Sequence, residues 1–335
     1  MAYELLGKPV GNIGFGLMSL TTAHNTSSED EKFALIKAAL DAGTNILNGG
    51  EFYGPSLEEN SLTLLNKYFT KHPEDTARAS IHIKGGSRPK FQVDNSPEYT
   101  RQSVQHCLDQ LGGQARIASW EMCRRVSQAD YLESLRVLDG FVKEGFIDGI
   151  SLSEVNANTI RQAVKICKIV AVEVEISLFN TDPLTDGVCE ACAEFGIPIF
   201  AYSPLGRGFL TGKVKTPDDL SAQGKWIPRY QGENFAANLQ LVEEVKKWAA
   251  RKGCTPGQFA INWVAALSQR PGMPKIIPIP GASKMAQVSE NLREVELTDA
   301  DMDEVDGFLA RFIPVGARVP ELAAGFLDKT DTTDI

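Results

Sequence analysis

Short apolar segments rich in β-branched residues alternate with longer amphipathic segments along most of the chain. The first apolar segment, 12–20, precedes the amphipathic segment 28–43, whose apolar residues recur with helical spacing and whose last residue is a glycine, a common helix stop. The same order of strand and helix then recurs along the chain. The other predicted strands are 44–50, 79–86, 115–123, 146–154, 169–177, 197–206 and 274–281, and the helices that follow them are 57–72, 96–113, 131–145, 156–168, 185–196, 238–253 with 256–270, and 284–296.

Eight consecutive strand-plus-helix units predict a parallel sheet closed into a (β/α)8 TIM barrel, formed by a single domain over 1–335. A doubly wound sheet would need a GxGxxG motif at the start of its first helix, but Gly11, Gly14 and Gly16 precede a strand and have a different spacing. In such a barrel the chemistry lies on the long βα loops at the carboxyl ends of the strands. The connection 207–235 is expected to form a lid there, and 313–335 forms a C-terminal tail that either folds over this end or extends freely.

Charge and composition exclude several classes of protein. The 335 residues carry a net charge of −9 and the pI is near 5.1, so no nucleic-acid or membrane partner is expected. The first residues lack a signal-peptide pattern and no apolar run is long enough to span a membrane, which favours a cytoplasmic location. Six dispersed cysteines, including Cys189 and Cys192 within a helical segment, and four histidines show no metal-site spacing, so no metal is expected. The sequence leaves the oligomeric state undetermined.

A tyrosine and a lysine stand at the ends of two successive predicted strands. Tyr53 follows the strand 44–50, and Lys84 comes near the end of the strand 79–86. A nearby ammonium lowers the pKa of a phenol, and a phenol tuned in this way could protonate a carbonyl oxygen while hydride reaches the carbonyl carbon. The alternatives are a packed aromatic side chain for Tyr53 and an ion-paired strand-end residue for Lys84.

A second group of candidates lies near the ends of the last two strands. Tyr202 ends a buried strand, where its ring could stack on a planar ligand. Backbone groups suited to close approach by a ligand follow it at Ser203, Leu205 and Gly206. Ser283 and Lys284 precede a helix, and amide donors together with the helix dipole favour an anion at such a place. The alternative for these two residues is a capped helix with a surface lysine.

Five segments, in chain order, resemble motifs of the aldo-keto reductase superfamily. They are GTNILNGGEFYG at 43–54, IHIKGG at 81–86, GFIDGISLSE at 145–154, AYSPLGRGFLTGK at 201–213 and PIPGASKMAQVSENL at 278–292. The match extends from Gly7 to Phe312. The resemblance implies a (β/α)8 barrel that binds NADPH across its strand ends and reduces carbonyls with a tetrad of Asp, Tyr, Lys and His.

The resemblance also implies a role for individual residues. Tyr53 matches the proton donor, and Lys84 matches the partner that lowers its pKa. The implied cofactor contacts are Ser153, Glu154 and Glu173 at the carboxamide, Tyr202 at the nicotinamide ring, Ser203, Leu205 and Gly206 at the pyrophosphate, Ser283 and Lys284 at the 2′-phosphate, and Gln287, Glu290 and Asn291 at the adenosine. Glu173 stands where a glutamine is usual, and Gln287 replaces a frequent arginine.

Two members of the tetrad differ from the superfamily pattern. Asn48 replaces the aspartate, which is expected to leave Lys84 freer to stabilise a tyrosinate. The strand 115–123 lacks the histidine: an ungapped count back from the next strand places Cys123 at that position, while a shifted alignment places Arg124 there. We favour Cys123, because the ungapped count keeps the intervening helix intact.

With these two replacements the sequence resembles the pyridoxal reductase branch of the superfamily. This resemblance implies reduction of pyridoxal to pyridoxine with NADPH. The alternatives are a broad reductase of aldehydes, ketones or sugars, and an NADPH-binding regulatory subunit with little turnover. Candidates for contact with the pyridine ring come from the predicted lid: Trp226, Arg229 and Tyr230. Strand alternation predicts that three further side chains face the barrel interior: His82, Glu121 and Glu175. We expect them to pack and form hydrogen bonds in a layer below the site.

Overall fold

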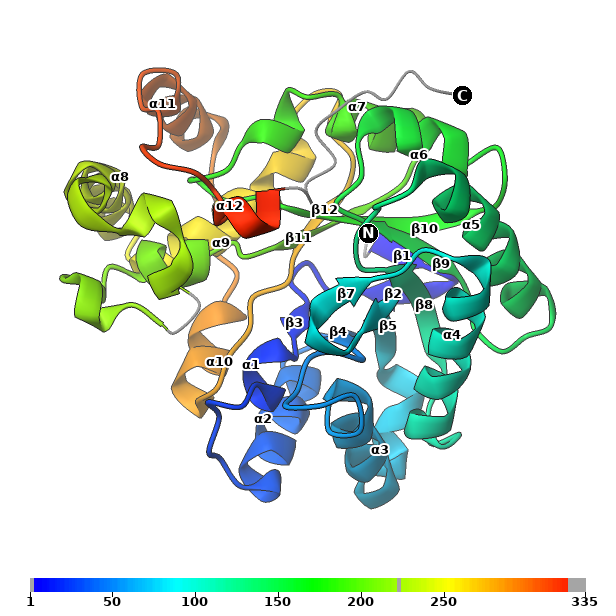
Figure 1. Ribbon diagram of the computed structural model, residues 1–335. Coiled ribbons are helices and arrows are strands. Elements are labelled where there is room, and N and C mark those ends of the chain that lie inside the picture. Colours follow the sequence, from blue (N-terminus) through cyan, green and yellow to red (C-terminus); the bar gives the residue numbers. More distant parts are fainter. Residues whose placement is uncertain (1–2, 222–223, 325–335) are drawn as a thin grey trace.

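Eight parallel strands form a closed ring in the computed structural model, which describes residues 3–221 and 224–324 (Figure 1). Around the ring, each strand pairs with the next in the order β3 (Phe15–Gly16), β4 (Ile46–Gly50), β5 (Ser80–Gly85), β8 (Ile117–Met122), β9 (Ile150–Ser153), β10 (Ile169–Glu175), β11 (Ile199–Tyr202) and β12 (Ile276–Pro278). The first and last strands meet, because Gly14 N donates to Pro278 O at 2.8 Å and Gly16 N donates to Pro280 O at 3.1 Å. The predicted (β/α)8 barrel is confirmed.

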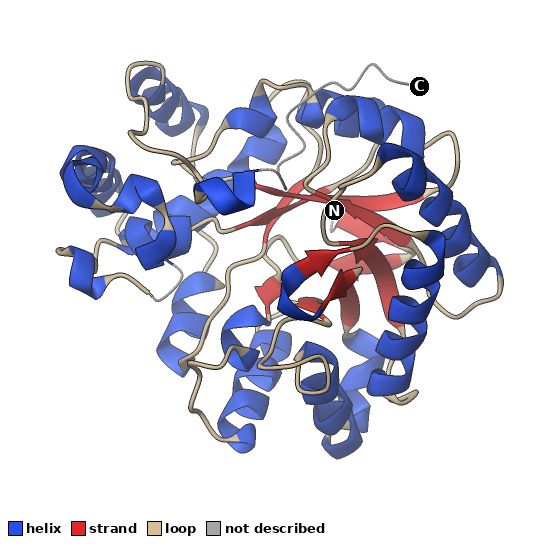
Figure 2. Cartoon of the chain, viewed as in Figure 1, coloured by secondary structure: helices blue, strands red, loops and turns tan. Residues whose placement is uncertain are grey.

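Helices surround the strands on the outside of the barrel (Figure 2). They are α1 (Met18–Thr21), α2 (Glu29–Asp41), α3 (Ser61–Lys71), α4 (Pro97–Leu111), α5 (Gln128–Lys143), α6 (Ala157–Ala163), α7 (Val188–Glu194), α8 (Gly232–Arg251), α9 (Pro256–Ala266), α10 (Met285–Asn291), α11 (Asp299–Leu309) and α12 (Glu321–Ala324). The start of α4 has a local cause, since the Ser96 side chain accepts from Tyr99 N and Pro97 occupies the first helical position. Across the described ranges, none of these helices combines the length and apolar character that a membrane span requires.

An N-terminal hairpin closes the amino end of the barrel. Its strands, β1 (Tyr3–Leu5) and β2 (Lys8–Val10), are antiparallel. Leu5 and Val10 are buried in one apolar cluster with interior barrel residues such as Phe200 and Ile277. Because this apolar layer fills the amino end, ligands have access to the barrel from the carboxyl ends of the strands.

Loops and the C-terminal segment build up the carboxyl end. A small hairpin, β6 (Ser87–Arg88) with β7 (Gln92–Val93), follows β5, and short 3-10 helices occupy much of the connection between β11 and α8. The C-terminal segment, red in Figure 1, is anchored on α8, where Val315 N donates to Asn238 Oδ1 at 2.9 Å. The described part of the predicted tail therefore folds back onto the barrel. Residues 325–335 of that tail and 222–223 of the predicted lid lie outside the described residues.

Candidate active site

A cavity of about 880 Å³ lies at the carboxyl ends of the barrel strands. This volume is within the range of roughly 300–1,000 Å³ that is typical of small-molecule and cofactor sites. The predicted site residues that line it are Asn48, Tyr53, Lys84, Glu173, Tyr202, Ser203, Leu205, Ser283, Gln287, Glu290 and Asn291. The tyrosine–lysine pair and the residues from the last two strands therefore share one cavity, although more than a hundred positions separate them in the chain.

The other predicted site residues do not line the cavity: Cys123, Ser153, Glu154, Gly206 and Lys284. Ser153 is fully buried, and its hydroxyl has no hydrogen-bond partner in the described part of the chain. Gly206 has a φ of +54°, and a Cβ added there would come within 3.0 Å of the Tyr230 hydroxyl. Lys284 is exposed at the start of α10.

Lys84 is the centre of a buried ion cluster. Its Nζ lies 2.9 Å from Glu121 Oε1 and also forms an ion pair with Glu173, and all three side chains are less than 5% exposed. Asn48 joins the cluster by donating from Nδ2 to Glu173 Oε2 at 2.6 Å and accepting from Lys84 at 3.3 Å. The expectation that Asn48 leaves Lys84 freer is wrong, because two glutamates supply the charge that an aspartate would bring. The lower-layer role expected for Glu121 is likewise wrong.

The cluster controls the charges of its own members. Burial lowers the pKa of the Lys84 ammonium, but the carboxylates of Glu121 and Glu173 outweigh it, so the net pKa is raised and the ammonium persists at neutral pH. Burial raises the pKa of Glu121 to about 8, although Lys84 acts in the opposite direction. The cluster therefore keeps the lysine charged, and Glu121 takes up a proton more readily than an exposed glutamate does.

Tyr53 lies beside this cluster. The Lys84 Nζ is 6.0 Å from the centroid of the Tyr53 ring, and the ring rests on Gly50, where a Cβ would approach it to 3.2 Å. Burial raises the pKa of Tyr53; Lys84 lowers it, as expected, but to a smaller extent, and Glu173 opposes Lys84. The net direction is therefore opposite to the one that the sequence suggested. The phenol stays protonated at neutral pH, which is the state that a proton donor requires.

Of the two candidates near the end of β8, Arg124 reaches the cavity and Cys123 does not. The strand ends at Met122 and the chain bends at Cys123, so strand alternation no longer decides which side chain faces inward. Cys123 is fully buried, and burial raises the pKa of its thiol to about 12, which leaves it unreactive at neutral pH. Arg124 is half-buried and donates from Nη1 to the Cys123 carbonyl oxygen at 2.5 Å.

A second ion cluster lies around Arg318 of the C-terminal segment. Its Nε donates to Glu175 Oε2 at 2.6 Å, and its Nη2 donates to Glu154 Oε1 and to the Tyr202 hydroxyl, both at 2.8 Å. Glu154 has a φ of +51°, and its Oε1 also accepts from Glu175 N at 3.0 Å. The lower-layer role expected for Glu175 is thus wrong. An isolated arginine near the C-terminus carries no sequence signal that could have predicted this contact.

His82 does occupy the lower layer of the barrel, as predicted. Its ring nitrogens lie 2.7 Å from Ser119 Oγ and 3.0 Å from Ser80 Oγ. Burial, with a smaller contribution from Lys84, lowers the pKa of His82 to about 3, so the imidazole is neutral. The prediction of buried hydrogen bonding is confirmed for this residue.

The opposite end of the cavity is formed by the start of α10. The Gln287 Oε1 accepts from Ser283 N at 2.9 Å and from Lys284 N at 3.1 Å. The amide donors predicted to hold a phosphate are therefore occupied by a neutral side chain, which a phosphate would have to displace. Glu290 joins this end to the connection after β11, since its Oε2 lies 3.0 Å from Lys213 Nζ.

The three candidates from the predicted lid make contacts outside the cavity or are exposed. The Tyr230 ring stacks on Phe209 with centroids 4.6 Å apart, Arg229 donates to the Phe179 carbonyl oxygen, and Trp226 is 74% exposed. None of the three candidates lines the cavity. The prediction that they contact a substrate ring is not supported by this arrangement, because two are used to hold the connection itself in place.

Two phenylalanines line the cavity instead, and the sequence interpretation missed them. Phe52 lies edge-to-face with Tyr53 at 4.9 Å and with Phe91 at 5.3 Å. Phe52 could have been found from its place beside Tyr53. Phe91 lies between β6 and β7 with a φ of +55°, and no pattern in the sequence marks a hairpin that short.

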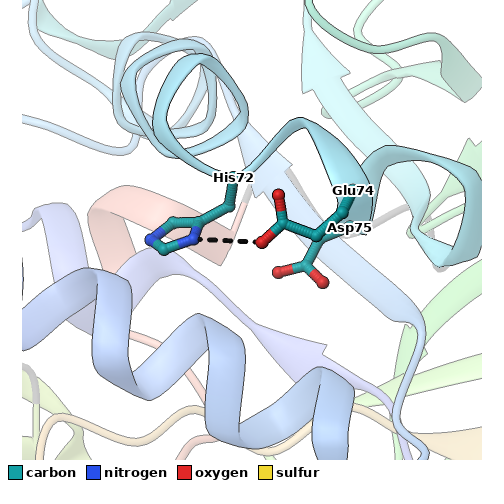
Figure 3. Close-up of side chains that lie close together, drawn as sticks. All are labelled: His72, Glu74 and Asp75. Carbon is teal, nitrogen blue, oxygen red and sulfur yellow. Dashed lines mark hydrogen bonds and ion pairs between the residues drawn. The ribbon is translucent and has the colours of Figure 1, made fainter.

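A group of potential metal ligands, His72, Glu74 and Asp75, lies on the outside of the barrel (Figure 3). His72 Nδ1 is 3.4 Å from Glu74 Oε1. Asp75 is already bonded by the Tyr68 hydroxyl and by Arg78, whose Nε donates at 2.9 Å. These bonds account for the buried carboxylate without a metal ion.

Comparisons with known proteins agree with the barrel and its cavity. The model of the aldo/keto reductase family matches residues 12–310. A Schizosaccharomyces pombe protein named probable pyridoxal reductase 2 is 34% identical over 322 residues, which cover 93% of this chain and 95% of that protein. Aldo-keto reductase yakc of the same organism, whose name specifies NADP(+), is 33% identical over 316 residues, covering 92% and 91%. The glycerol dehydrogenase AKR11B4 from Gluconobacter oxydans shares the fold, with a TM-score of 0.80 at 23% identity over 94% of this chain and 97% of that one.

Proposed function

The chain belongs to the aldo/keto reductase family and is an oxidoreductase, and we propose that it reduces the aldehyde of pyridoxal to the alcohol of pyridoxine with NADPH. One observation carries the proposal: Tyr53, Lys84 and Tyr202 line a single cavity whose wall also includes Phe52 and Phe91. These residues combine a proton donor, a cation beside it and flat apolar surfaces suited to an aromatic substrate. The names of the relatives supply the specific substrate and cofactor.

When it is bound, NADPH supplies the hydride that adds to the carbonyl carbon. Tyr53 donates its phenolic proton to the carbonyl oxygen, so the product is a neutral alcohol. Lys84 stabilises the tyrosinate that remains, because its ammonium lies near the ring and persists at neutral pH. Tyr53 then regains a proton from solvent before the next turnover.

The residues present fit a nicotinamide dinucleotide. The Tyr202 ring, at the end of β11, lines the cavity and offers a stacking surface. The buried Ser153 hydroxyl at the end of β9 has no hydrogen-bond partner among the described residues, so it suits a carboxamide. Ser203 and Leu205 would lie along the pyrophosphate. Ser283 and Lys284 would hold the 2′-phosphate once the Gln287 side chain releases their backbone amides. Gln287, Glu290 and Asn291 would contact the adenosine.

A panel of aldehydes tests the proposed reaction. NADPH oxidation is followed with pyridoxal and with simple aliphatic, aromatic and sugar aldehydes, and kcat/KM is expected to be at least about tenfold higher for pyridoxal, as one or two specific polar contacts would produce. Equal values across the panel would replace the pyridoxal assignment with a broad reductase. NADPH binding without turnover of any carbonyl would favour the regulatory-subunit alternative.

Tyr53→Phe tests the proton donor. We expect NADPH binding close to that of the wild type and a loss of kcat of about 10²–10⁴-fold, the usual contribution of general acid catalysis. Tyr3→Phe, at the amino end of the barrel, is the matched control. Full turnover by Tyr53→Phe would remove Tyr53 from the reaction.

The proposed location is the cytoplasm, where a small-molecule substrate would be reduced. The acidic net charge and the free cysteines fit this location.

A further inference from the structure

Three cations near Tyr53 and Tyr202 differ in how their charge is balanced. Lys84 contacts two carboxylates, and Arg318 contacts two others. Arg124 has no carboxylate within ion-pairing distance among residues 3–221 and 224–324; its one hydrogen bond goes to the carbonyl oxygen of the preceding residue. A guanidinium offers five N–H donors, so most of those of Arg124 remain for another acceptor.

Arg124 lies close to the proposed proton donor. It lines the same cavity as Tyr53, and its charge acts on both Tyr53 and Tyr202. Burial lowers the pKa of Arg124, but the surrounding acidic groups outweigh it, so the guanidinium remains charged. A charged, half-buried group that faces a ligand cavity without a carboxylate partner is costly unless the ligand supplies the acceptor.

The neighbouring surfaces indicate the shape of that ligand. Phe52 and Phe91 meet edge-to-face at 5.3 Å and line the cavity with Arg124. Aromatic faces and edges favour a planar ring, and a guanidinium matches an oxyanion with charge-assisted, often bidentate, hydrogen bonds. The proton donor, the aromatic surface and the Arg124 guanidinium therefore suit one molecule that carries a carbonyl, a ring and an anionic oxygen.

We propose that Arg124 is a specificity-determining residue that binds an oxyanion on the ring of an aromatic aldehyde substrate. The inference rests on the proposed function and names the substrate class more closely: aldehydes with a phenolate or carboxylate on the ring. The ionised ring hydroxyl of pyridoxal belongs to this class. An aldehyde of the same shape without the negative charge leaves the Arg124 donors unsatisfied, so it is a poorer substrate.

The test uses 3-carboxybenzaldehyde and its methyl ester, which share the ring and the aldehyde but differ in charge. For the wild type we expect kcat/KM to be about 10–100-fold higher for the acid than for the ester, the effect of one charge-assisted hydrogen bond. Arg124→Met is expected to abolish this preference by lowering kcat/KM for the acid more than for the ester, and Arg124→Lys to keep part of it. Arg116→Met, at the other end of β8, is the matched control and should retain the full preference.

The outcomes separate this inference from the proposed function. An unchanged acid-to-ester ratio in Arg124→Met overturns the inference and leaves the reductase activity in place. NADPH affinity is measured by fluorescence titration. If Arg124→Met loses much of this affinity and keeps the acid-to-ester ratio, Arg124 binds the cofactor and the inference is also overturned. Absence of turnover of every aldehyde by the wild type removes the proposed function instead. Calorimetric binding of 3-carboxybenzyl alcohol, which needs no turnover, would still report the role of Arg124, and equal affinities of the wild type and Arg124→Met would overturn it.

Discussion

Two buried ion clusters at the carboxyl end of the barrel have the same composition and a different origin. Each consists of one cation and two carboxylates: the lysine cluster is Lys84 with Glu121 and Glu173, and the arginine cluster is Arg318 with Glu154 and Glu175. β10 contributes one carboxylate to each, since Glu173 and Glu175 are two residues apart and therefore face the same side of the strand. The cation of the first cluster lies on a barrel strand, whereas that of the second lies on the C-terminal segment.

This difference suggests that the lysine cluster serves the reaction and that the arginine cluster holds the C-terminal segment in place. The lysine cluster is formed entirely by side chains of the barrel strands β5, β8 and β10. It lies beside the proposed proton donor, so its charges are available for the reaction. The arginine cluster is complete only when the C-terminal segment docks, and Arg318 then also holds the Tyr202 hydroxyl at 2.8 Å. Changes to the first cluster should therefore act mainly on turnover, and changes to the second on cofactor binding and stability.

The largest effect is expected for Lys84→Met. It removes the cation that stabilises a tyrosinate, and it leaves the buried Glu121 and Glu173 without their cation. We expect kcat to fall about 10²–10⁴-fold and the free energy of unfolding to fall by about 3–5 kcal/mol. Steady-state kinetics and urea unfolding measure the two effects.

A triple variant separates stability from chemistry at this site. Lys84→Met combined with Glu121→Gln and Glu173→Gln contains no buried charge in the cluster, so most of the lost stability should return. Activity should not return, because no cation is left beside Tyr53. Recovery of turnover in the triple variant would contradict a catalytic role for Lys84.

A smaller and different effect is expected for Arg318→Met. Glu154 and Glu175 lose their cation and Tyr202 loses its hydrogen-bond donor, so the platform proposed for the nicotinamide is held less firmly. We expect the Kd for NADPH to rise about 3–30-fold and the free energy of unfolding to fall by about 2–4 kcal/mol, with kcat at saturating NADPH changed less. Fluorescence titration and urea unfolding provide the measurements.

Arg311→Met is the matched control for this variant, because Arg311 is exposed shortly before the C-terminal segment. It should leave both the Kd and the stability close to those of the wild type. The comparison of the two clusters fails if Arg318→Met reduces kcat as strongly as Lys84→Met while NADPH binding is unchanged.

The pH dependence of stability should have opposite signs in the two clusters. Burial raises the pKa of Glu121 from 4.5 to about 8, so its contribution to stability is present below 4.5 and is lost as the pH rises toward 8. Burial also acts to raise the pKa of Glu154, but Arg318 and Arg124 outweigh it and lower the net value, so that contribution is present above 4.5 and is lost on acidification. Glu121→Gln should therefore flatten the decline of wild-type stability between about pH 5 and 8 by on the order of 1–3 kcal/mol.

Urea unfolding at several pH values within this window measures the slope. Glu154→Gln is the contrasting variant: it should lower stability throughout the window and change the slope little, because Glu154 is already ionised there. A wild-type slope that Glu121→Gln leaves unaltered would show that Glu121 does not take up a proton in the folded protein near neutral pH.

The two clusters also mark how far the sequence could predict the molecule. The barrel and the nearness of Tyr53 to Lys84 followed from local patterns, since strand ends in a parallel barrel meet at one end. Strand alternation correctly predicted that Glu121 faces the barrel interior. It does not predict the layer of the interior in which a side chain lies, and that layer decides whether a carboxylate packs below the site or contacts Lys84. The contacts of Arg318 could not be predicted, because its partners lie more than a hundred residues away in the chain and no periodicity connects them to it. Such contacts depend on where a loop or tail docks.

The smallest effect is expected when a carboxylate is moved within the lysine cluster. Asn48→Asp alone places a third carboxylate beside Glu173, and Glu173→Gln alone removes one from Lys84, so each should reduce kcat by about 3–10-fold. The two changes together exchange the donor and the acceptor of the 2.6 Å hydrogen bond between residues 48 and 173 and leave the number of carboxylates next to Lys84 unchanged, because Glu121 remains. The double variant should therefore be within about twofold of the wild type, a coupling that a double-mutant cycle in kcat measures. Additive losses would mean that the site depends on which strand carries the charge, whereas recovery would mean that Lys84 requires a carboxylate at this point in space, whether it comes from β4 or from β10.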